Sequence, residues 1–175
     1  MSNVPLVIIN AFLFIVPAYI GNASAALFGH GKPIDSGRKL ADGRRLFGDG
    51  KTWAGFLLGV FFAFAAGTTE GYFLQGSGLE VGGVGTYALL GLMLGIGSMT
   101  GDLLGSFVKR RMGFGRGKKA PLWDQLNFVL GAILFAAPIM VPPWNQLLVI
   151  LVATPGIHLF LNWLGHELNC KPVPW

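Results

Sequence analysis

Two isolated carboxylates flank a dense group of cations between residues 101 and 127. Asp102 lies near the end of one apolar run and Asp124 at the start of the next. Between them the segment 109–119 has no acid and carries the basic residues Lys109, Arg110, Arg111, Arg116, Lys118 and Lys119. Carboxylate oxygens bind hard divalent cations, and lysine and arginine bind phosphate. The segment therefore indicates a site for a metal ion and a polyphosphate.

Three polar residues around the first acid follow a helical spacing. Asp102, Ser106 and Lys109 stand at i, i+4 and i+7, so a helix places them on one face near its end. With Asp124 they form the predicted catalytic set. A structural alternative pairs Asp102 with Lys109 or Arg110 at the membrane boundary, since a charge near hydrocarbon is costly unless it is paired. By that alternative Ser106 bonds back to a helix carbonyl.

The second acid opens a further polar group. Asp124 follows Pro121-Leu122-Trp123, which is typical of a helix start, and an acid there also interacts favourably with the helix dipole. Gln125 and Asn127 continue the polar surface. Carboxylate and amide oxygens are a normal ligand set for Mg²⁺. We therefore predict Mg²⁺ on Asp102, Asp124 and Asn127, with Gln125 binding substrate.

A glycine-containing turn in the segment 44–55, RRLFGDGKTWAG, is a second candidate for phosphate binding. Gly48 and Gly50 allow an anion to approach the backbone closely. Lys51 and Thr52 stand at the predicted start of a helix, where a phosphate is favoured. The P-loop spacing is absent, and an ordinary turn at the membrane boundary is the alternative. With Arg110, Lys118 and Lys119, these residues complete the predicted substrate-binding set.

The composition assigns these sites to a membrane protein. Hydrophobic residues make up 53% and charged residues 12% of the 175-residue chain, and the mean hydropathy is +0.59. Soluble domains carry about 25% charged residues. We predict an all-α, single-domain fold (1–175) with five transmembrane helices at about 4–29, 53–75, 83–108, 122–141 and 144–164. The residues before Val4 lack the positive charge of a signal peptide, so no cleavage is expected.

The positions of the basic residues predict the orientation of the chain. All thirteen lie in 30–52, in 109–119 or at Lys171, and the loops near 76–82 and 142–143 have none. Five spans bring those three segments to one side, which the positive-inside rule makes cytoplasmic. The amino terminus is then outside and the carboxyl terminus inside, with cytoplasmic loops at about 30–52 and 109–121.

The third predicted span carries glycines at 91, 95, 97, 101 and 105. Glycines four residues apart form a smooth groove that a neighbouring helix can approach closely. Asp102 stands beside this groove, and close packing can hold a carboxylate in one geometry, which a metal site requires.

The site residues resemble the signature of the integral-membrane CDP-diacylglycerol synthase family. Ser106, Lys109, Arg110, a downstream Lys118 or Lys119, Pro121 and Asp124 match it in order, and Asp102 matches the family's Gly-Asp pair. The KTWAG at 51–55 resembles the family's K-K-T-W-E-G turn. Two features depart from the pattern: the G-H-G-G element is missing, and Asn127 replaces the final acid. Five spans, PLWDQLNF and a short chain are most similar to the CDP-archaeol synthase branch.

This resemblance implies a CTP-dependent cytidylyltransferase in the cell membrane. Its substrates would be CTP and an isoprenoid ether-lipid phosphate, 2,3-di-O-geranylgeranylglyceryl phosphate, and its products CDP-archaeol and pyrophosphate. Mg²⁺ on Asp102 and Asp124 would hold the nucleotide phosphates, and the prenyl tails would lie among membrane lipids. No nucleic-acid partner is expected.

Three other functions are alternatives. A small transporter predicts charges at the bilayer midplane and a sequence repeat, and neither is visible. A scaffold that binds anionic lipid through its basic loops leaves Asp102 and Asp124 unexplained. A CDP-alcohol phosphotransferase uses a longer array of acids, of which Asp42-Gly43 is only a fragment.

Overall fold

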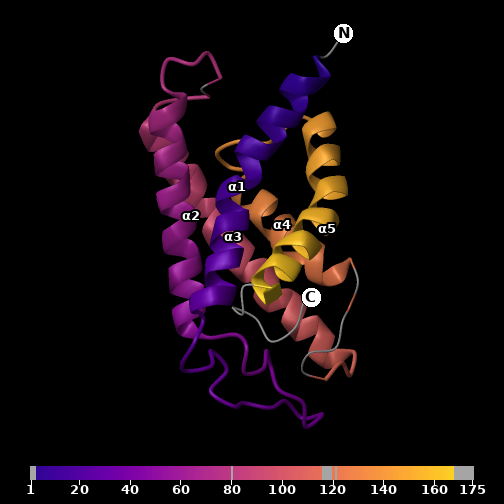
Figure 1. Cartoon of the computed structure of the whole chain (residues 1–175). Coiled ribbons are helices and arrows are strands. Elements are labelled where there is room, and N and C mark those ends of the chain that lie inside the picture. Colours follow the sequence, from indigo (N-terminus) through magenta and orange to yellow (C-terminus); the bar gives the residue numbers. More distant parts are fainter. Residues whose placement is uncertain (1–2, 80, 116–119, 121, 168–175) are drawn as a thin grey trace.

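The computed structural model describes residues 3–79, 81–115, 120 and 122–167, and its regular structure there consists of helices (Figure 1). In chain order these are α1 (Val4–Phe28), α2 (Trp53–Leu74), α3 (Val84–Arg111), α4 (Trp123–Ala136) and α5 (Trp144–Glu167). The four long helices begin and end within three residues of the predicted boundaries. Each of the four is long and apolar enough to cross a membrane.

The fourth predicted span, 122–141, is longer than the helix that forms there. α4 has 14 residues, which corresponds to about 21 Å, whereas the hydrocarbon core is about 30 Å thick. The helix ends at Ala136, and a turn follows over 137–139. Pro138 explains this end, because proline cannot donate a backbone hydrogen bond and disfavours helix in the preceding residue. The apolar residues after Ala136 extended the hydropathy signal beyond the helix.

Small residues hold α2 against α3. The buried residues of α2 recur every fourth position: Gly55, Gly59, Ala63, Gly67 and Gly71. A Cβ added at Gly91 of α3 would lie 2.6 Å from the Ala63 carbonyl oxygen, and one added at Gly95 would lie 2.8 Å from the Ala63 Cβ. These contacts leave no space for a side chain. The two helices therefore pack backbone to backbone, as small residues allow in membranes.

The remaining α3 glycines face α4. A Cβ at Gly97 would lie 2.7 Å from the Phe135 Cβ, and one at Gly101 would meet the Asn127 carbonyl oxygen. The predicted groove is thus two glycine faces, one for α2 and one for α4. Since Asp102 is next to Gly101 in sequence, the packing of α3 on α4 also determines where this carboxylate lies relative to Asp124.

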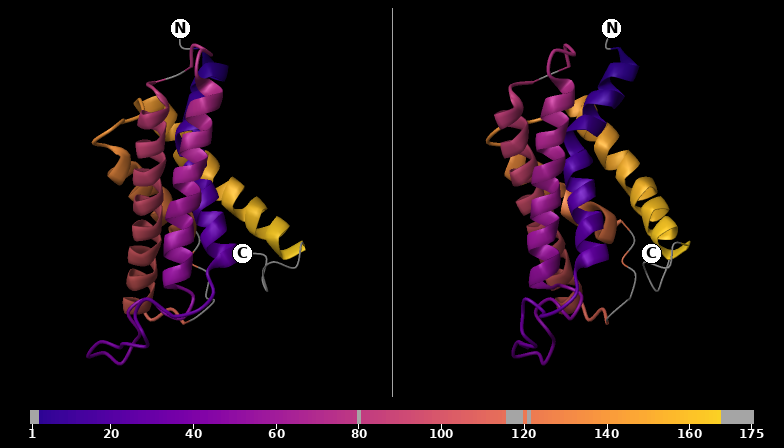
Figure 2. Two further views of the ribbon diagram at one scale, coloured as in Figure 1. Left: turned by 90° about the vertical axis from the view of Figure 1, so that its left-hand side faces the viewer. Right: turned by 60° about the vertical axis from the view of Figure 1, so that its left-hand side comes forward.

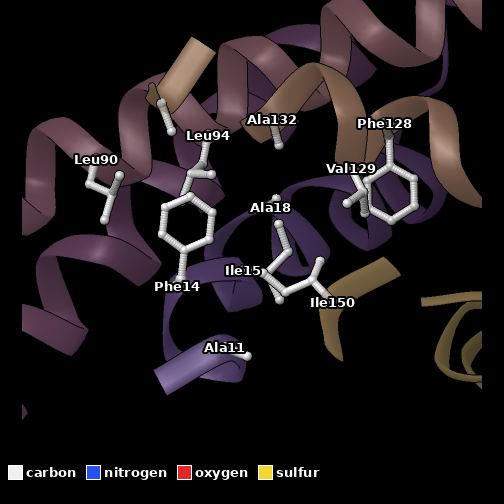
Figure 3. Packing of buried hydrophobic residues seen from close by; sticks show 11 residues of the cluster. Ala11, Phe14, Ile15, Ala18, Leu90, Leu94, Phe128, Val129, Ala132 and Ile150 are labelled. Atoms are coloured by element: carbon white, nitrogen blue, oxygen red, sulfur yellow. The ribbon is translucent and has the colours of Figure 1, made fainter. Parts of the chain in front are cut away.

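A hydrophobic core joins the other helices (Figure 3). Ile15 and Ala18 of α1, Leu94 of α3 and Val129 of α4 are fully buried in it, and Ile150 of α5 contacts the same cluster. In contrast, Ile150 and Thr154 are the buried residues of α5. This helix therefore lies at the edge of the bundle.

The loop 29–52 and the carboxyl end of α3 lie at the same end of the bundle (Figure 1). The Arg111 side chain pairs with Asp42 at 2.5 Å and donates to the Arg45 carbonyl at 2.6 Å. In return, Arg44 donates to the Arg111 carbonyl at 2.7 Å. Two segments that are distant in sequence are therefore joined next to the predicted site.

Gly101→Ala is expected to lower the thermal stability of the detergent-purified protein, because the added methyl group meets the Asn127 carbonyl. Overpacking of this kind costs about 1–3 kcal/mol. Gly85→Ala, on the same helix, meets nothing within 4 Å and should be neutral or slightly stabilising. Melting curves of the two variants provide the check. Equal melting temperatures would contradict the packing described for α3 and α4.

Candidate active site

A cavity of about 330 Å³ opens among α1, α2, α3, α4 and α5, beside the loop 29–52. Several predicted site residues line it together: Gly50, Lys51, Thr52, Asp102, Ser106, Lys109 and Asp124. They come from the loop, from the start of α2, from the last turns of α3 and from the first turn of α4. The apolar part of the wall includes Phe56, Met99 and Leu103. The fold therefore brings both acids of the sequence pattern to one cavity.

Each of the two carboxylates is paired with a lysine. The Lys51 ammonium donates to Asp102 Oδ2, and the Lys109 ammonium donates to both oxygens of Asp124, at 2.7 and 2.9 Å. The alternative that Asp102 pairs with a cation of its own helix did not foresee this partner, because Lys51 lies before α2. All four side chains are partly buried. Two positive groups thus occupy positions next to the carboxylates, where a metal ion and phosphates would also interact.

A buried acid that the sequence analysis did not select organises the loop. The Asp35 carboxylate is inaccessible to solvent and accepts from Arg45 at 2.6 Å. It also accepts from the backbone amides of Gly37, Phe47 and Gly48, at 3.0–3.2 Å. The Arg45 guanidinium, with these amides, holds the pKa of the Asp35 carboxyl far below its usual range. An acid within a strongly basic segment was the available signal for this role.

Two predicted substrate-binding side chains have structural partners. The Thr52 hydroxyl caps α2 by accepting from the Gly55 amide at 3.0 Å and donates to the Gly29 carbonyl at 2.9 Å. Gln125 Oε1 accepts from the Leu122 amide at 2.5 Å at the start of α4. Thr52 nevertheless lines the cavity. The contacts of Thr52 and Gln125 explain them first as helix caps.

Gly48 and Arg110 line a different cavity, of about 440 Å³, which shares Gly50 with the first. The Gly48 amide is bonded to Asp35, and Gly48 has a φ of +101°, which favours glycine. Arg110 donates to the Phe47 carbonyl at 3.4 Å and to the Phe114 carbonyl at 2.5 Å. The turn at 44–52 therefore has two sides, one for each cavity.

The predicted metal ligand Asn127 lies on the helix interface. Its side chain occupies the space that a Cβ at Gly105 would fill, and Asn127 is not among the residues that line the 330 Å³ cavity. Within the described ranges there is no group of three or more His, Cys, Asp and Glu side chains suited to a metal ion. Lys118 and Lys119 lie outside the described residues. The geometry thus brings Asp102 and Asp124 together and leaves Asn127 on α3.

Three polar residues inside the predicted spans also line the cavity, and the sequence analysis assigned none of them to the site. They are Asn22 of α1 and His158 and Asn162 of α5. Their signal was weak, because one polar residue in an apolar helix can have a purely structural partner. The cavity consequently has a charged wall from α3 and α4 and an uncharged polar wall that includes α5.

The charged wall is suited to a nucleotide and a divalent cation. Carboxylate oxygens on Asp102 and Asp124 can hold a hard cation, and Lys51 and Lys109 can contact phosphate oxygens. The Ser106 hydroxyl, one turn beyond Asp102, can donate a further hydrogen bond. These are the groups that phosphoryl-type transfer uses to position and neutralise its reactants.

Known proteins share both this sequence and this fold. The family model described as "CarS-like: CDP-archaeol synthase" matches residues 4–175. The CDP-archaeol synthase of Thermococcus gammatolerans is 42% identical over 165 residues, which cover 94% of this chain and 95% of that protein. That of Methanopyrus kandleri is 45% identical over 164 residues, with coverages of 93% and 90%.

One solved structure, of an intramembrane enzyme for archaeal membrane lipid biosynthesis, superposes with a TM-score of 0.78 at 36% identity. The match covers 89% of this chain and 94% of that one. The family match spans nearly the full length and includes the whole cavity. This chain therefore belongs to the CDP-archaeol synthase family.

Proposed function

We propose that the 330 Å³ cavity is the site where this chain transfers the cytidylyl group of CTP to a lipid phosphate. As a member of its family the chain is a membrane-embedded cytidylyltransferase that forms CDP-archaeol. We assign 2,3-di-O-geranylgeranylglyceryl phosphate as the lipid. The observation that carries the proposal is the joint presence of Asp102, Asp124, Lys51 and Lys109 in one cavity at the end of the bundle.

The reaction needs no covalent intermediate with the protein. An anionic oxygen of the lipid phosphate attacks the α-phosphorus of CTP, and a new phosphorus–oxygen bond forms. The bond from the α-phosphorus to the bridging oxygen of the β-phosphate breaks, and pyrophosphate leaves. Since the attacking phosphate is already ionised at neutral pH, no general base is required. The protein therefore has to position two polyanions and reduce their repulsion.

Lys51 and Lys109 are the cations that contact the phosphates in this proposal, with Ser106 as a hydrogen-bond donor. Both lysines reach the cavity from different elements, so each can turn from its carboxylate to a phosphate oxygen. Gly50 allows the backbone to approach the same group. Arg110 and Gly48 would contact the part of the nucleotide that extends into the 440 Å³ cavity.

The donor set also fits Mg²⁺. Asp102 and Asp124 supply hard oxygen ligands from two helices held together by glycine, and each already lies beside a positive group. Mg²⁺, when bound by these carboxylates, would neutralise phosphate charge and support departure of pyrophosphate. Asn127 remains a prediction as a ligand, and its contact with Gly105 does not support that role.

We place the amino terminus outside and the carboxyl terminus in the cytoplasm. The bundle gathers the loop 29–52 and residues 109–115 at one end (Figure 1), and these segments contain most of the basic residues. The positive-inside rule assigns this end to the cytoplasm. This orientation opens the proposed site toward the compartment that contains CTP.

Two labelled nucleotides test the reaction. The detergent-purified protein is incubated with Mg²⁺, the ether-lipid phosphate and CTP that carries ³²P at either the α or the γ position. We expect the α label in the lipid fraction and the γ label in pyrophosphate. Transfer of the γ label to lipid would indicate a kinase instead. No transfer of either label would overturn the proposed function.

Lys51→Ala is expected to raise the KM for CTP about tenfold, because the loss of one charged contact to a phosphate costs about 1.4 kcal/mol or more. Lys39→Ala is the matched control, since Lys39 is exposed on the same loop. Initial rates at varied CTP measure both variants. A normal KM in Lys51→Ala would exclude this lysine from the nucleotide site.

A further inference from the structure

The inner face of α5 carries polar residues at four-residue intervals. Thr154, His158 and Asn162 stand at i, i+4 and i+8, so they share one face of the helix. The opposite face is apolar and exposed, with Val152 at 72% and Phe160 at 57%. Imidazole and amide groups are costly in hydrocarbon, and such residues usually face a polar cavity or a partner in the bundle.

The stripe divides into two parts at Pro155. Thr154, which precedes the proline, is fully buried and bonds to the Tyr19 hydroxyl at 2.8 Å. That contact holds α5 against α1 and explains Thr154 by structure alone. His158 and Asn162, which follow the proline, line the 330 Å³ cavity. Their position needs an explanation that packing does not provide.

The two residues hold one another in a defined geometry. The Asn162 side-chain nitrogen lies 3.0 Å from His158 Nδ1, and the His158 ring lies 5.8 Å from the Phe128 ring. An amide nitrogen can only donate, so Nδ1 accepts and the neutral imidazole carries its proton on Nε2. His158 is thus oriented as a hydrogen-bond donor in a cavity wall, a role that suits an anionic or ether oxygen.

The position of α5 links this wall to the bilayer. Among the described residues, the helix contacts of α5 are with α1 and α4. Figure 2 shows its carboxyl-terminal half leaning away from α2 and α3. A nucleotide reaches the cavity from the loops, but a lipid has to arrive from the membrane. The polar wall on α5 is therefore the part of the site that faces an incoming lipid.

We infer that His158 and Asn162 bind the phosphate and glycerol end of the acceptor lipid and orient its attacking oxygen toward CTP on the charged wall. This inference rests on the proposed function. In it, Lys51 and Lys109 serve the nucleotide and the α5 pair serves the lipid. The two substrates are then recognised by different helices, so their KM values can be changed separately.

The test measures KM for the lipid phosphate and for CTP separately, in mixed micelles with the full-length protein. His158→Leu and Asn162→Leu are each expected to raise the lipid KM about tenfold and to leave the CTP KM within twofold. His158→Gln keeps an amide donor and should restore a lipid KM within threefold of wild type. Leu159→Ala, on the exposed face of α5, is the matched control.

The outcomes separate the two proposals. An absence of CDP-lipid from the wild-type protein would overturn the proposed function itself. If the wild type is active, an unchanged lipid KM in His158→Leu and Asn162→Leu would overturn only the lipid-binding role. Equal rises in both KM values, without rescue by His158→Gln, would show a structural role and would overturn it too. If His158→Leu fails to fold, Asn162→Leu and His158→Gln decide the question.

Discussion

Replacement of Asp102 or Asp124 by asparagine is expected to lower the rate of CDP-lipid formation about 1000-fold, which is the size of effect that loss of a central electrostatic group produces. Asparagine keeps the shape of each side chain but removes the charge that would hold a divalent cation. Each change also leaves a partly buried lysine, Lys51 or Lys109, without its carboxylate partner. Radiolabelled product formation at saturating CTP, lipid phosphate and Mg²⁺ measures the loss.

Asp42→Asn is the control for both changes. Asp42 pairs with Arg111 near the same end of the bundle, but it is more exposed and lines neither cavity. Its variant should retain turnover within about twofold of wild type, because exposed ion pairs contribute little. The melting temperatures of all three variants show whether the helices remain assembled. Near-normal turnover in well-folded Asp102→Asn and Asp124→Asn would remove both residues from the reaction.

Asp35→Ala is expected to disrupt the loop 29–52. The change removes a buried carboxylate that binds Arg45 and three backbone amides. Loss of one partner of a buried ion pair costs about 3–5 kcal/mol. Since Gly50 and Lys51 belong to this loop and line the cavity, turnover should fall about 100-fold, and trypsin should cleave within the loop more rapidly.

Asp49→Asn is a matched comparison, because Asp49 pairs with the same arginine at 2.7 Å from an exposed position. It should change both trypsin sensitivity and turnover little. If Asp35→Ala and Asp49→Asn behaved alike, the loop would not depend on the buried carboxylate.

The same carboxylate predicts a dependence of stability on pH. The folded-state pKa of Asp35 is lowered, mainly by Arg45, whereas its unfolded value is about 3.9. Its stabilising contribution is therefore fully present above about pH 4 and is lost as the pH falls toward the lowered folded-state pKa. The difference in melting temperature between wild type and Asp35→Asn should stay constant from pH 7 to pH 5 and narrow below pH 4. A difference that stays constant down to pH 3 would contradict this.

The long helices were predictable because hydropathy and aromatic or basic boundaries report directly on a bilayer. The end of α4 was not, since the residues after Ala136 are equally apolar and only Pro138 marks the change. The glycine groove of α3 was visible, but its division between α2 and α4 was not, because spacing alone does not name a partner. The matching repeat in α2, which includes Gly59 and Gly67, carried the same signal and was not used.

The acids of the site were predictable because isolated charges beside apolar runs are rare. Their partners were less so: Lys51 reaches Asp102 from another element, and no local spacing contains that contact. Capping roles compete with ligand roles for the same residue types, and the contacts of Gln125 show that competition. His158 gave no clear signal, because its neighbours in the cavity come from other helices.

Binding of Mn²⁺ in the presence of CTP tests most directly whether both carboxylates hold one cation with the nucleotide. Mn²⁺ replaces Mg²⁺ here because its electron paramagnetic resonance signal distinguishes free from bound ion. The wild-type protein in detergent should bind Mn²⁺ in a CTP-dependent manner, and Asp102→Asn and Asp124→Asn should each weaken this binding at least about tenfold. Undiminished, CTP-dependent Mn²⁺ binding by both folded variants would contradict the account.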